Sequence, residues 1–344
     1  MRLAVNARVT SFSMGGQQRV TAEILKRLGP VETIAPSRPL AGPRGHAWEQ
    51  FVLPLRTIGR LLWSPSATGP VVKRDQVVTL HDVAFLDRPE FFSANFARAY
   101  RMILPPLMKR AARVVTVSEF SRRRIAFWYG LDPGEIEVIG NGVSEQFRHY
   151  GADEIAATRA ALGLPPTYFL LQATSDRRKN LAGALAAWAA ALPHLPAGLE
   201  LVVTGNLART HVFGDMAPIG EEPRVKLLGY VEEEHMGPLL AGAQVFLFPT
   251  LYEGFGLPII EAMACGAPVL TSAATATQEI AGEAALLVDP TSVDDIAHGM
   301  RKLALDASLR ARLVAAGQER AKLYSWDDAA RKYRELFRSL GAGS

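Results

Sequence analysis

The chain contains a single cysteine, Cys265, among 344 residues. One thiol cannot build an internal disulfide framework or a metal site made of several cysteines. This usage fits a reducing compartment, so we expect a cytoplasmic protein. No run of about eighteen apolar residues occurs, so no membrane-spanning helix is expected. The opening MRLAVNARV predicts a first strand rather than a secretory signal.

Two common nucleotide-binding signatures are also missing. A nicotinamide oxidoreductase should carry Gly-x-Gly-x-x-Gly directly after a strand. The nearest match, GFGLPI at residues 254–259, has isoleucine in the place of the third glycine. No Walker lysine loop is present either. These absences argue against a dinucleotide oxidoreductase and a P-loop enzyme.

The charge that is present is spread unevenly over a chain long enough for two domains. Residues 1–150 carry 21 Lys and Arg against 12 Asp and Glu, whereas residues 151–344 carry 17 against 22. Such asymmetry indicates halves with different partners. A basic half suits an anionic membrane surface or a phosphorylated substrate, but solvated surface arginines explain it equally well. We expect no nucleic-acid partner.

Short, nearly continuous apolar runs alternate with helical patterns, which is typical of buried parallel sheets covered by helices. The chain is therefore predicted to be α/β, with two doubly wound, Rossmann-like domains. Helices are expected at NLAGALAAWAAAL and VDDIAHGMRKLAL. The predicted strands are RLAVNAR, QVVTLHD, RVVTVSE and IEVIGNG in the first half, and YFLLQAT, LELVVTG, VKLLGYV, QVFLFPT, APVLTSA and AALLVDP in the second.

The predicted boundary between the domains lies near SEQFRHYGADE, around residues 144–154. The first domain is expected to span residues 1–150 and the second residues 151–324. The tail SWDDAARKYRELFRSL is amphipathic, with Trp326, Ala330, Tyr333 and Phe337 at helical spacing. Ligands of doubly wound sheets bind at the carboxyl ends of the strands, so the residues that follow each strand are the candidates for a site.

The segment YEGFGLPIIEAMACGAPV follows the strand QVFLFPT. Pro258 suits the first turn of a helix, and the pattern predicts a helix from about Pro258 to Cys265 that ends at Gly266. Glu253 then lies on the loop before the helix, and Glu261 lies in the first turns of the helix. The segment therefore places one carboxylate on each side of a helix amino end.

This arrangement suits a nucleotide-sugar. The helix start offers backbone N–H groups of Phe255, Gly256 and Leu257 together with positive dipole potential. Gly254 and Gly256 let a ligand approach the backbone. One carboxylate can accept from both hydroxyls of a ribose, and the other can hold a second polyol. The structural alternative is that Glu261 only complements the helix dipole and Glu253 caps the loop.

The Glu-x7-Glu spacing, with EGFGLP and EAMACGAPV, resembles the retaining GT-B glycosyltransferases of family 4, in their mannosyltransferase-like branch. The likeness covers nearly the whole chain. It implies two Rossmann-like domains that face a central cleft, with a C-terminal helix of about residues 325–344 that crosses back to the N-terminal domain. The supporting segments, in chain order, are SMGGQQRVTAEIL, VVTLHDVAFLDRPEFFS, VVTVSEFSRRRI, VIGNGV, SDRRKNL, LLGYVEEEHMGPLLAGA and the Ser-Trp helix.

The resemblance implies a role for four charged residues at the donor. Glu253 would contact the donor sugar and Glu261 would hold the ribose. Lys179, in RRKN, matches the lysine that binds the diphosphate, and its neighbour Arg178 is a second phosphate ligand. Many relatives carry a further arginine a few residues earlier, where this chain has only Ala173 and Thr174. The structural alternative is a solvated basic turn.

The remaining site residues come from other strand ends. Gly15 and Gly16 would let a phosphate or the acceptor approach, or they form a simple loop. The resemblance also implies that Tyr230 and Val231 sandwich the base.

His81 and Asp82 end the strand QVVTL, a region that lies near the donor sugar and the acceptor in such enzymes. A histidine there can hydrogen-bond a sugar hydroxyl, and Asp82 can orient it or bind the acceptor. Alternatively, Asp82 is a helix N-cap and His81 a hydrogen-bonded core histidine.

The resemblance further implies retention of anomeric configuration, GDP-mannose as the donor and a saccharide or polyprenyl-diphosphate-linked saccharide as the acceptor. No cofactor is expected beyond the nucleotide-sugar. The chain has no Asp-x-Asp, so the metal-dependent GT-A class is disfavoured and no metal ligand is predicted.

Other interpretations stay open. The donor could be a UDP-sugar, or the chain could be a nucleotide-sugar epimerase or a non-catalytic sensor. RRRIAFWYG, at residues 122–130, could contact the inner membrane surface peripherally or form a helix with one wet and one buried face.

Overall fold

A computed structural model describes residues 1–12, 15–205 and 223–342, and the chain divides into two compact units. Unit 1 comprises Met1–Pro89, Ala94–Gly142 and Ser325–Ser344, and unit 2 comprises Glu90–Ser93 and Val143–Tyr324. The chain thus enters unit 2 a little before residue 150 and leaves it at residue 324. The sequence did not predict that four residues of the first half, Glu90–Ser93, would group with unit 2.

Unit 1 is built on a parallel sheet of six strands, counted over the described residues, in the order β2-β1-β3-β4-β5-β6. The sequence predicted four of these strands and missed β2 and β3. The strands are β1 (Arg2–Asn6), β2 (Glu32–Ile34), β3 (Arg60–Ser64), β4 (Gln76–Thr79), β5 (Arg113–Thr116) and β6 (Ile136–Val138). The helices are η1 (Ala7–Ser11), α1 (Gly16–Leu28), α2 (Gly42–Phe51), α3 (Leu53–Arg56), α4 (Ala84–Asp87), α5 (Ala94–Arg110), α6 (Glu119–Tyr129), η3 (Pro133–Glu135) and α14 (Trp326–Ser339). The short η2 (Pro89–Phe91) begins in unit 1 and ends in the segment Glu90–Ser93 of unit 2.

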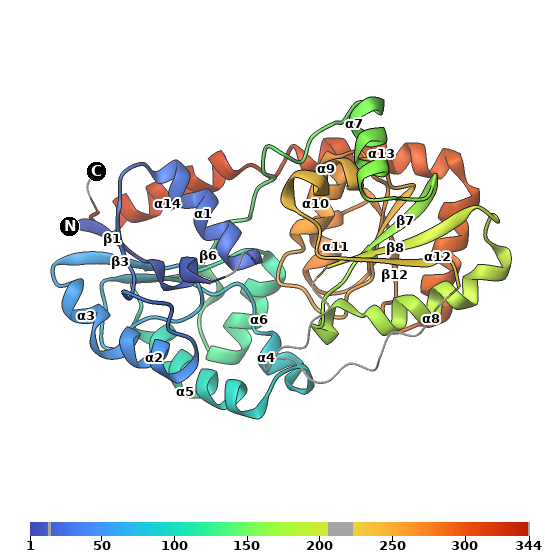
Figure 1. The fold of residues 1–344 in the computed structure, drawn as a ribbon. Helices are drawn as coiled ribbons and strands as arrows, with labels where there is room; N and C mark the ends of the chain where they lie inside the picture. The colour runs from blue at the N-terminus through green and yellow to red at the C-terminus, as the bar shows by residue number, and fades with distance from the viewer. Residues whose placement is uncertain (13–14, 206–222, 343–344) are drawn as a thin grey trace. The chain divides into compact units, whose positions relative to one another are not determined.

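Helices cover both faces of this sheet because successive strand residues point to opposite sides. Leu62 of β3 packs with Trp48 and Leu53 from α2 and α3. Its neighbour Trp63 faces α14, where its ring centroid lies 4.9 Å from that of Tyr333. Figure 1 shows α1 and α14 on one face of the sheet and α2 and α3 on the other. The C-terminal helix is therefore part of the first core, as expected.

Unit 2 contains a second parallel sheet, also of six strands over the described residues, in the order β12-β11-β10-β7-β8-β9. The sequence predicted all six. The strands are β7 (Thr167–Gln172), β8 (Leu199–Thr204), β9 (Val225–Gly229), β10 (Val245–Phe248), β11 (Val269–Ser272) and β12 (Ala285–Val288). The helices are α7 (Ala152–Ala161), η4 (Arg177–Lys179), α8 (Leu181–Ala191), η5 (Leu192–His194), α9 (Glu233–Ala241), α10 (Leu257–Ala264), α11 (Thr275–Ala281), α12 (Val293–Leu305) and α13 (Ala307–Ala321).

The order of this sheet fixes where a ligand site belongs. Phe169 of β7 packs in one apolar cluster with Trp188 of α8, whereas its neighbour Leu170 packs in a second cluster with Ile259 of α10. The chain therefore passes to one face of the sheet after β7 and to the other face after β10, although the two strands are neighbours. The carboxyl ends of β7 and β10 form the topological switch point, where doubly wound proteins bind ligands.

Close contacts fix the chain where it enters and leaves the main segment of unit 2, Val143–Tyr324. Within unit 2, Val143 N donates to Tyr324 O at 3.1 Å. Within unit 1, Gly142 lies against the start of α14, where a Cβ on this glycine would stand 2.1 Å from Trp326 N. No larger residue fits at position 142 without moving the backbone of α14.

Candidate active site

The structure brings together two predicted donor-binding residues that are far apart in sequence. Lys179 lies at the end of η4, after β7, and Glu253 lies in the loop after β10. Lys179 Nζ donates to Glu253 Oε1 at 2.7 Å, and the two side chains are 22% and 15% exposed. The ammonium also lies 4.9 Å from the centroid of the Phe248 ring. A cation and a carboxylate therefore meet at the switch point, within reach of solvent.

Backbone and amide hydrogen bonds hold the two loops together. Leu251 N donates to Arg178 O at 2.7 Å. Asn180 Nδ2 donates to Pro249 O at 2.9 Å and to Pro290 O at 2.7 Å. Asn180 has a φ of 56°, a left-handed conformation that asparagine tolerates better than most residues. The position of Lys179 is thus fixed by the residues that flank it on both sides.

Arg178, predicted as a second phosphate ligand, is already engaged by a carboxylate. Its guanidinium makes several hydrogen bonds to Asp176, the shortest at 2.6 Å from Nη2 to Oδ2. Its Cζ also lies 5.2 Å from the centroid of the Phe92 ring, in the short segment Glu90–Ser93. The charge of Arg178 is therefore balanced by Asp176 before any ligand arrives, as that of Lys179 is balanced by Glu253. Asp176, the N-cap of η4, was not predicted as a site residue.

The loop that carries Glu253 is braced from α11. Glu253 N donates to Thr275 Oγ1 at 3.3 Å, and Ala276 N donates to Glu253 O at 3.3 Å. Thr275 was not predicted, but it follows β11, so a search of every strand end would have found it. Phe255 is buried, and its ring meets that of Tyr324 edge-on at 5.6 Å.

Gly254 and Gly256 are both buried in this loop, and Leu257 begins α10. Gly256 has a φ of 100°, which a residue with a Cβ rarely adopts. The first N–H groups of α10 have no partner within the helix, as at any helix start. The predicted helix from Pro258 to Cys265 is thus found one residue earlier, and Gly266 follows it with a φ of 82°.

Glu261, the second glutamate of the motif, lies in the second turn of α10 and is only 5% exposed. One turn further along, burial raises the pKa of the Cys265 thiol to about 12, and the charge of Glu261 adds to this rise. The single cysteine is therefore protonated at neutral pH and forms part of the core. We assign it no role in the reaction.

Tyr230 and Val231 differ sharply in exposure. Tyr230 follows β9 and is 68% exposed, whereas Val231 is buried in the same apolar cluster as Leu239 of α9. Only the tyrosine offers its side chain to a ligand. Residues 206–222, which precede β9, lie outside the described residues.

The glycine loop after β1 belongs to unit 1. Gly15 is the N-cap of α1, with an extended φ of −149°, and Gly16 is its first residue. A Cβ on Gly16 would meet no atom within 4 Å, and one on Gly15 would meet only the flexible end of Gln18. The backbone therefore does not itself require glycine at either position. Ser13 and Met14 of the same predicted loop lie outside the described residues.

His81 and Asp82 follow β4 in unit 1. The histidine is hydrogen-bonded in the core, as in the structural alternative, whereas Asp82 lies one residue before Val83, the N-cap of α4. His81 is 8% exposed, and its Nε2 lies 2.9 Å from Pro65 O. Because a carbonyl can only accept, Nε2 carries the proton. Burial lowers the pKa of His81, and the Pro65 hydrogen bond and the charge of Asp82 offset this in part. Asp82 Oδ1 accepts from Ala84 N at 2.9 Å, near the start of α4.

A buried ionic cluster near the carboxyl end of β1 was not predicted. Glu49 of α2 is fully buried and meets Arg8 Nε at 3.0 Å. Asn6 Nδ2 and Thr68 Oγ1 also donate to it, at 2.9 and 2.8 Å. Burial opposes ionisation of Glu49, but hydrogen bonding to His46 and the charge of Arg8 outweigh burial and lower its pKa. Arg8 comes two residues after β1, which is the signal that could have identified this cluster.

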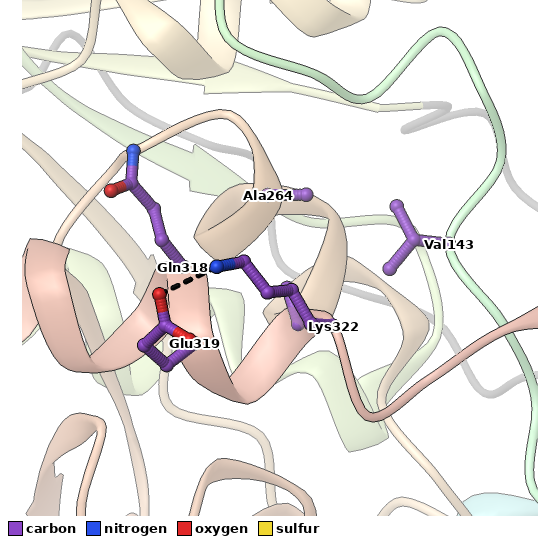
Figure 2. A pocket seen from close by; sticks show the side chains of 6 residues that line it. Val143, Ala264, Gln318, Glu319 and Lys322 are labelled. Carbon is purple, nitrogen blue, oxygen red and sulfur yellow. Dashed lines mark hydrogen bonds and ion pairs between the residues drawn. The ribbon is translucent and has the colours of Figure 1, made fainter.

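Unit 2 also contains a cavity of about 350 Å³ (Figure 2). Val143 and Lys322, which line it, lie close to the two ends of the main segment of unit 2. Lys322 is paired with Glu319 at 2.6 Å, as Figure 2 shows. None of the predicted site residues lines this cavity. Across the described ranges, no three His, Cys, Asp or Glu side chains are grouped as metal ligands would be.

Two Rossmann-like sheets, with a lysine and a glutamate paired at the switch point of the second, define a glycosyltransferase of the GT-B fold. The profile described as "Glycosyl transferases group 1" matches residues 167–306, and that described as "Glycosyltransferase Family 4" matches residues 59–147. The chain belongs to glycosyltransferase family 4.

Curated relatives agree with this assignment, and a solved structure shares the fold. The chain is 30% identical to the O-antigen chain mannosyltransferase B of Escherichia coli, over 77% of this chain and 70% of that protein. It is 26% identical to the serotype-specific mannosyltransferase WbdA of the same species, over 77% of this chain but only a third of WbdA. Anabaena HepE in complex with UDP has the same fold, with a TM-score of 0.75, 18% identity and coverage of 98% of this chain and 100% of that one.

None of the described helices combines the length and the apolar composition that a crossing of the bilayer needs.

Proposed function

We propose that the protein transfers mannose from GDP-mannose, with retention, to a hydroxyl of a saccharide or of a polyprenyl-diphosphate-linked saccharide in surface polysaccharide assembly. The observation that carries this proposal is the contact between Lys179 and Glu253 at the carboxyl ends of β7 and β10. A nucleotide-sugar needs a cation for its diphosphate and a carboxylate for its hydroxyls, and these two groups lie side by side here.

The pair also suggests an order of events. Without donor, each charge balances the other at 2.7 Å. The diphosphate would replace Glu253 as the partner of Lys179, which would leave the oxygens of Glu253 to accept from sugar hydroxyls. The N–H groups of Phe255, Gly256 and Leu257 and the dipole of α10 would add stabilisation of the phosphate. Buried Glu261 would hold the ribose.

In the proposed reaction, the bond from the anomeric carbon to the diphosphate breaks and a bond to the acceptor oxygen forms on the same face. The acceptor proton passes to an oxygen of the leaving diphosphate. Negative charge grows on that group in the transition state, where Lys179 would stabilise it. Glu253, His81 and Asp82 would position the sugar and the acceptor.

The remaining predicted residues have supporting roles in this proposal. Exposed Tyr230, with the backbone of Val231, would cover the base. Arg178 would be a second phosphate ligand and would have to share its guanidinium between the phosphate and Asp176. Gly15 and Gly16, which the backbone does not require, would leave room for the donor phosphates or the acceptor.

The donor assignment rests on the mannosyltransferases among the relatives. A UDP-sugar is the second candidate, because the HepE structure of the same fold holds UDP. We further propose that transfer needs no divalent metal. Activity that EDTA abolishes and magnesium restores would contradict this part of the proposal.

Thermal-shift titration with GDP-mannose, GDP, UDP-glucose and UDP tests the donor. A ligand that binds only the native state raises the melting temperature by mass action. We expect a shift with GDP-mannose and GDP alone. A shift with the UDP compounds alone would overturn the mannose assignment while leaving a nucleotide-sugar site in place.

The E261Q variant should lose most of the shift if the carboxylate holds the ribose. E319Q, in which the exchanged carboxylate is 73% exposed and away from the site, is the matched control. Once an acceptor is found, the configuration of the new linkage, measured by NMR, tests retention.

A further inference from the structure

The helices α2 and α3 present apolar side chains on both of their faces. They form a nearly continuous helical stretch, since Val52 N donates to Trp48 O and Arg56 N donates to Val52 O. Trp48 and Leu53 face inward and pack in the core of unit 1. A surface helix of a globular protein normally carries polar residues on its outer face.

The outer face of this stretch instead carries Phe51 and Leu55, whose spacing of four residues places them on one side of a helix. Ile58 follows in the turn after Thr57, the C-cap of α3. The side chains of Phe51, Leu55 and Ile58 are 74%, 71% and 73% exposed. Single exposed apolar residues are common, but three large ones within eight residues indicate a surface that is normally covered.

A neighbouring loop extends this surface. Val71 N donates to Gln50 Oε1 at 2.9 Å, and Lys73 Nζ donates to Thr57 O at 2.9 Å. Val72 lies between these two anchors and is 65% exposed. Phe51, Leu55, Ile58 and Val72 together are called the apolar patch.

The charge around the apolar patch is mostly positive. Residues 32–75 contain six Lys and Arg against three Asp and Glu. Glu49 is fully buried against Arg8, Glu32 is paired with Arg60 at 2.9 Å, and Asp75 is exposed. Arg44, Arg56 and Arg74 are exposed as well. The patch is therefore a group of large apolar side chains on a surface of net positive charge.

We propose that the apolar patch docks unit 1 on an anionic lipid surface. An interfacial helix buries large apolar side chains among the acyl chains while Lys and Arg bind anionic headgroups. A second copy of the chain is a poorer occupant, because a symmetric contact would bring two cationic surfaces together. The segment at residues 122–130 is also a poorer lipid surface, because Arg122 and Arg124 are already paired with Glu119 and Asp87.

Flotation with lipid vesicles tests this proposal on the full chain. We expect binding to vesicles of phosphatidylcholine mixed with phosphatidylglycerol, little binding to phosphatidylcholine alone, and loss of binding at high salt. The double variant F51S/L55S should weaken partitioning by about tenfold or more, since it removes two large apolar groups. R56Q/R74Q should weaken it by a similar factor at low salt, from the loss of two headgroup contacts.

Two matched variants make the experiment decisive. F127S removes a phenylalanine of α6 that is 68% exposed, and M102S removes an exposed residue of α5. Both should bind vesicles like the unchanged protein. Loss of binding in F127S but not in F51S/L55S would overturn the assignment to the apolar patch. Equal binding to neutral and anionic vesicles, or no binding at all, would overturn the lipid proposal.

Sedimentation of the same variants tests whether a second copy of the chain, rather than lipid, binds the apolar patch. Self-association that F51S/L55S abolishes, in a protein that does not bind vesicles, would show that the apolar patch is a contact between copies and would overturn the proposal. The double variant should keep its melting temperature and its response to GDP. A failure of vesicle binding is therefore distinguishable from a failure of the proposed donor site.

Discussion

At the scale of single residues, the ion pair between Lys179 and Glu253 contributes too little to folding stability to explain its presence. Both side chains are partly exposed, and such pairs contribute about 0–1 kcal/mol to folding. Their loops are nevertheless fixed by hydrogen bonds from Leu251 and Asn180. Positioning without much stabilisation is what a ligand-binding pair requires.

We expect K179M to lower kcat/KM for the donor by about 100- to 1,000-fold, the usual effect of removing one group that stabilises a leaving oxyanion. The melting temperature should change little. K322M is the control, because Lys322 is also paired with a glutamate in unit 2 but lies outside the site. Steady-state kinetics measure kcat/KM for both variants. An equal loss of kcat/KM in K179M and K322M would contradict the role of Lys179 in binding the leaving diphosphate.

His81 should make stability depend on pH. Burial depresses its folded-state pKa below the ordinary value of 6.5, so the unfolded chain binds a proton that the folded chain does not. Its contribution to stability is therefore full above pH 6.5 and is lost as the pH falls toward the folded pKa. We expect H81N to flatten the slope of unfolding free energy against pH below 6.5, by up to about 1.4 kcal/mol per pH unit.

Urea unfolding at several pH values measures this slope. H149N is the control, since His149 is exposed. A slope that is the same in H81N and in the unchanged protein would show that the imidazole titrates alike in the folded and unfolded chain.

At the scale of elements, α14 completes the core of unit 1. Tyr333 is buried, its hydroxyl lies 2.9 Å from Thr79 Oγ1, and the same threonine oxygen accepts from Trp63 Nε1 at 3.0 Å. The ring of Phe337 also lies 5.8 Å from that of Trp63. One helix thus contributes an aromatic cluster and a buried polar contact to strands that precede it by more than 250 residues.

We expect Y333A to lower the free energy of unfolding of unit 1 by about 3–5 kcal/mol, because it leaves a cavity the size of an aromatic ring. Y333F should cost only about 1 kcal/mol through the lost hydrogen bond. Tryptophan fluorescence during urea unfolding is the measurement, because four of the five tryptophans lie in unit 1. Equal costs for the two variants would contradict the packing role.

The elements that the sequence predicted are those whose buried residues form an apolar run or a regular apolar spacing. All strands of the second sheet are apolar runs bounded by turns, and α14 has a clear helical period. The three-residue β2, with the sequence ETI, has almost no apolar signal of its own. β3 follows α3 within a few residues, so its LLW is hard to separate from the helical pattern before it. Tertiary pairing with β1 decides both strands.

At the scale of the whole molecule, the order of strands explains which site contacts were predictable. Residues after β7 and β10 could be selected as strand-end residues, and the sheet order then makes them neighbours. The sequence could not show that Asp176 binds Arg178 or that Thr275 supports Glu253, because these contacts depend on loop conformation. The excess of positive charge was visible from composition, but its concentration beside Phe51 and Leu55 was not, since it depends on which face of a helix is buried.

The return of the chain to its first unit has a consequence for synthesis. Residues leave the ribosome in order, so everything that unit 2 needs has been made once Tyr324 emerges. Unit 1 must wait for α14, which is made after all of unit 2. The nascent protein can therefore finish its second unit before its first. Until then Trp63 and its neighbours on one face of the first sheet lack their cover and are the surface most in need of a chaperone.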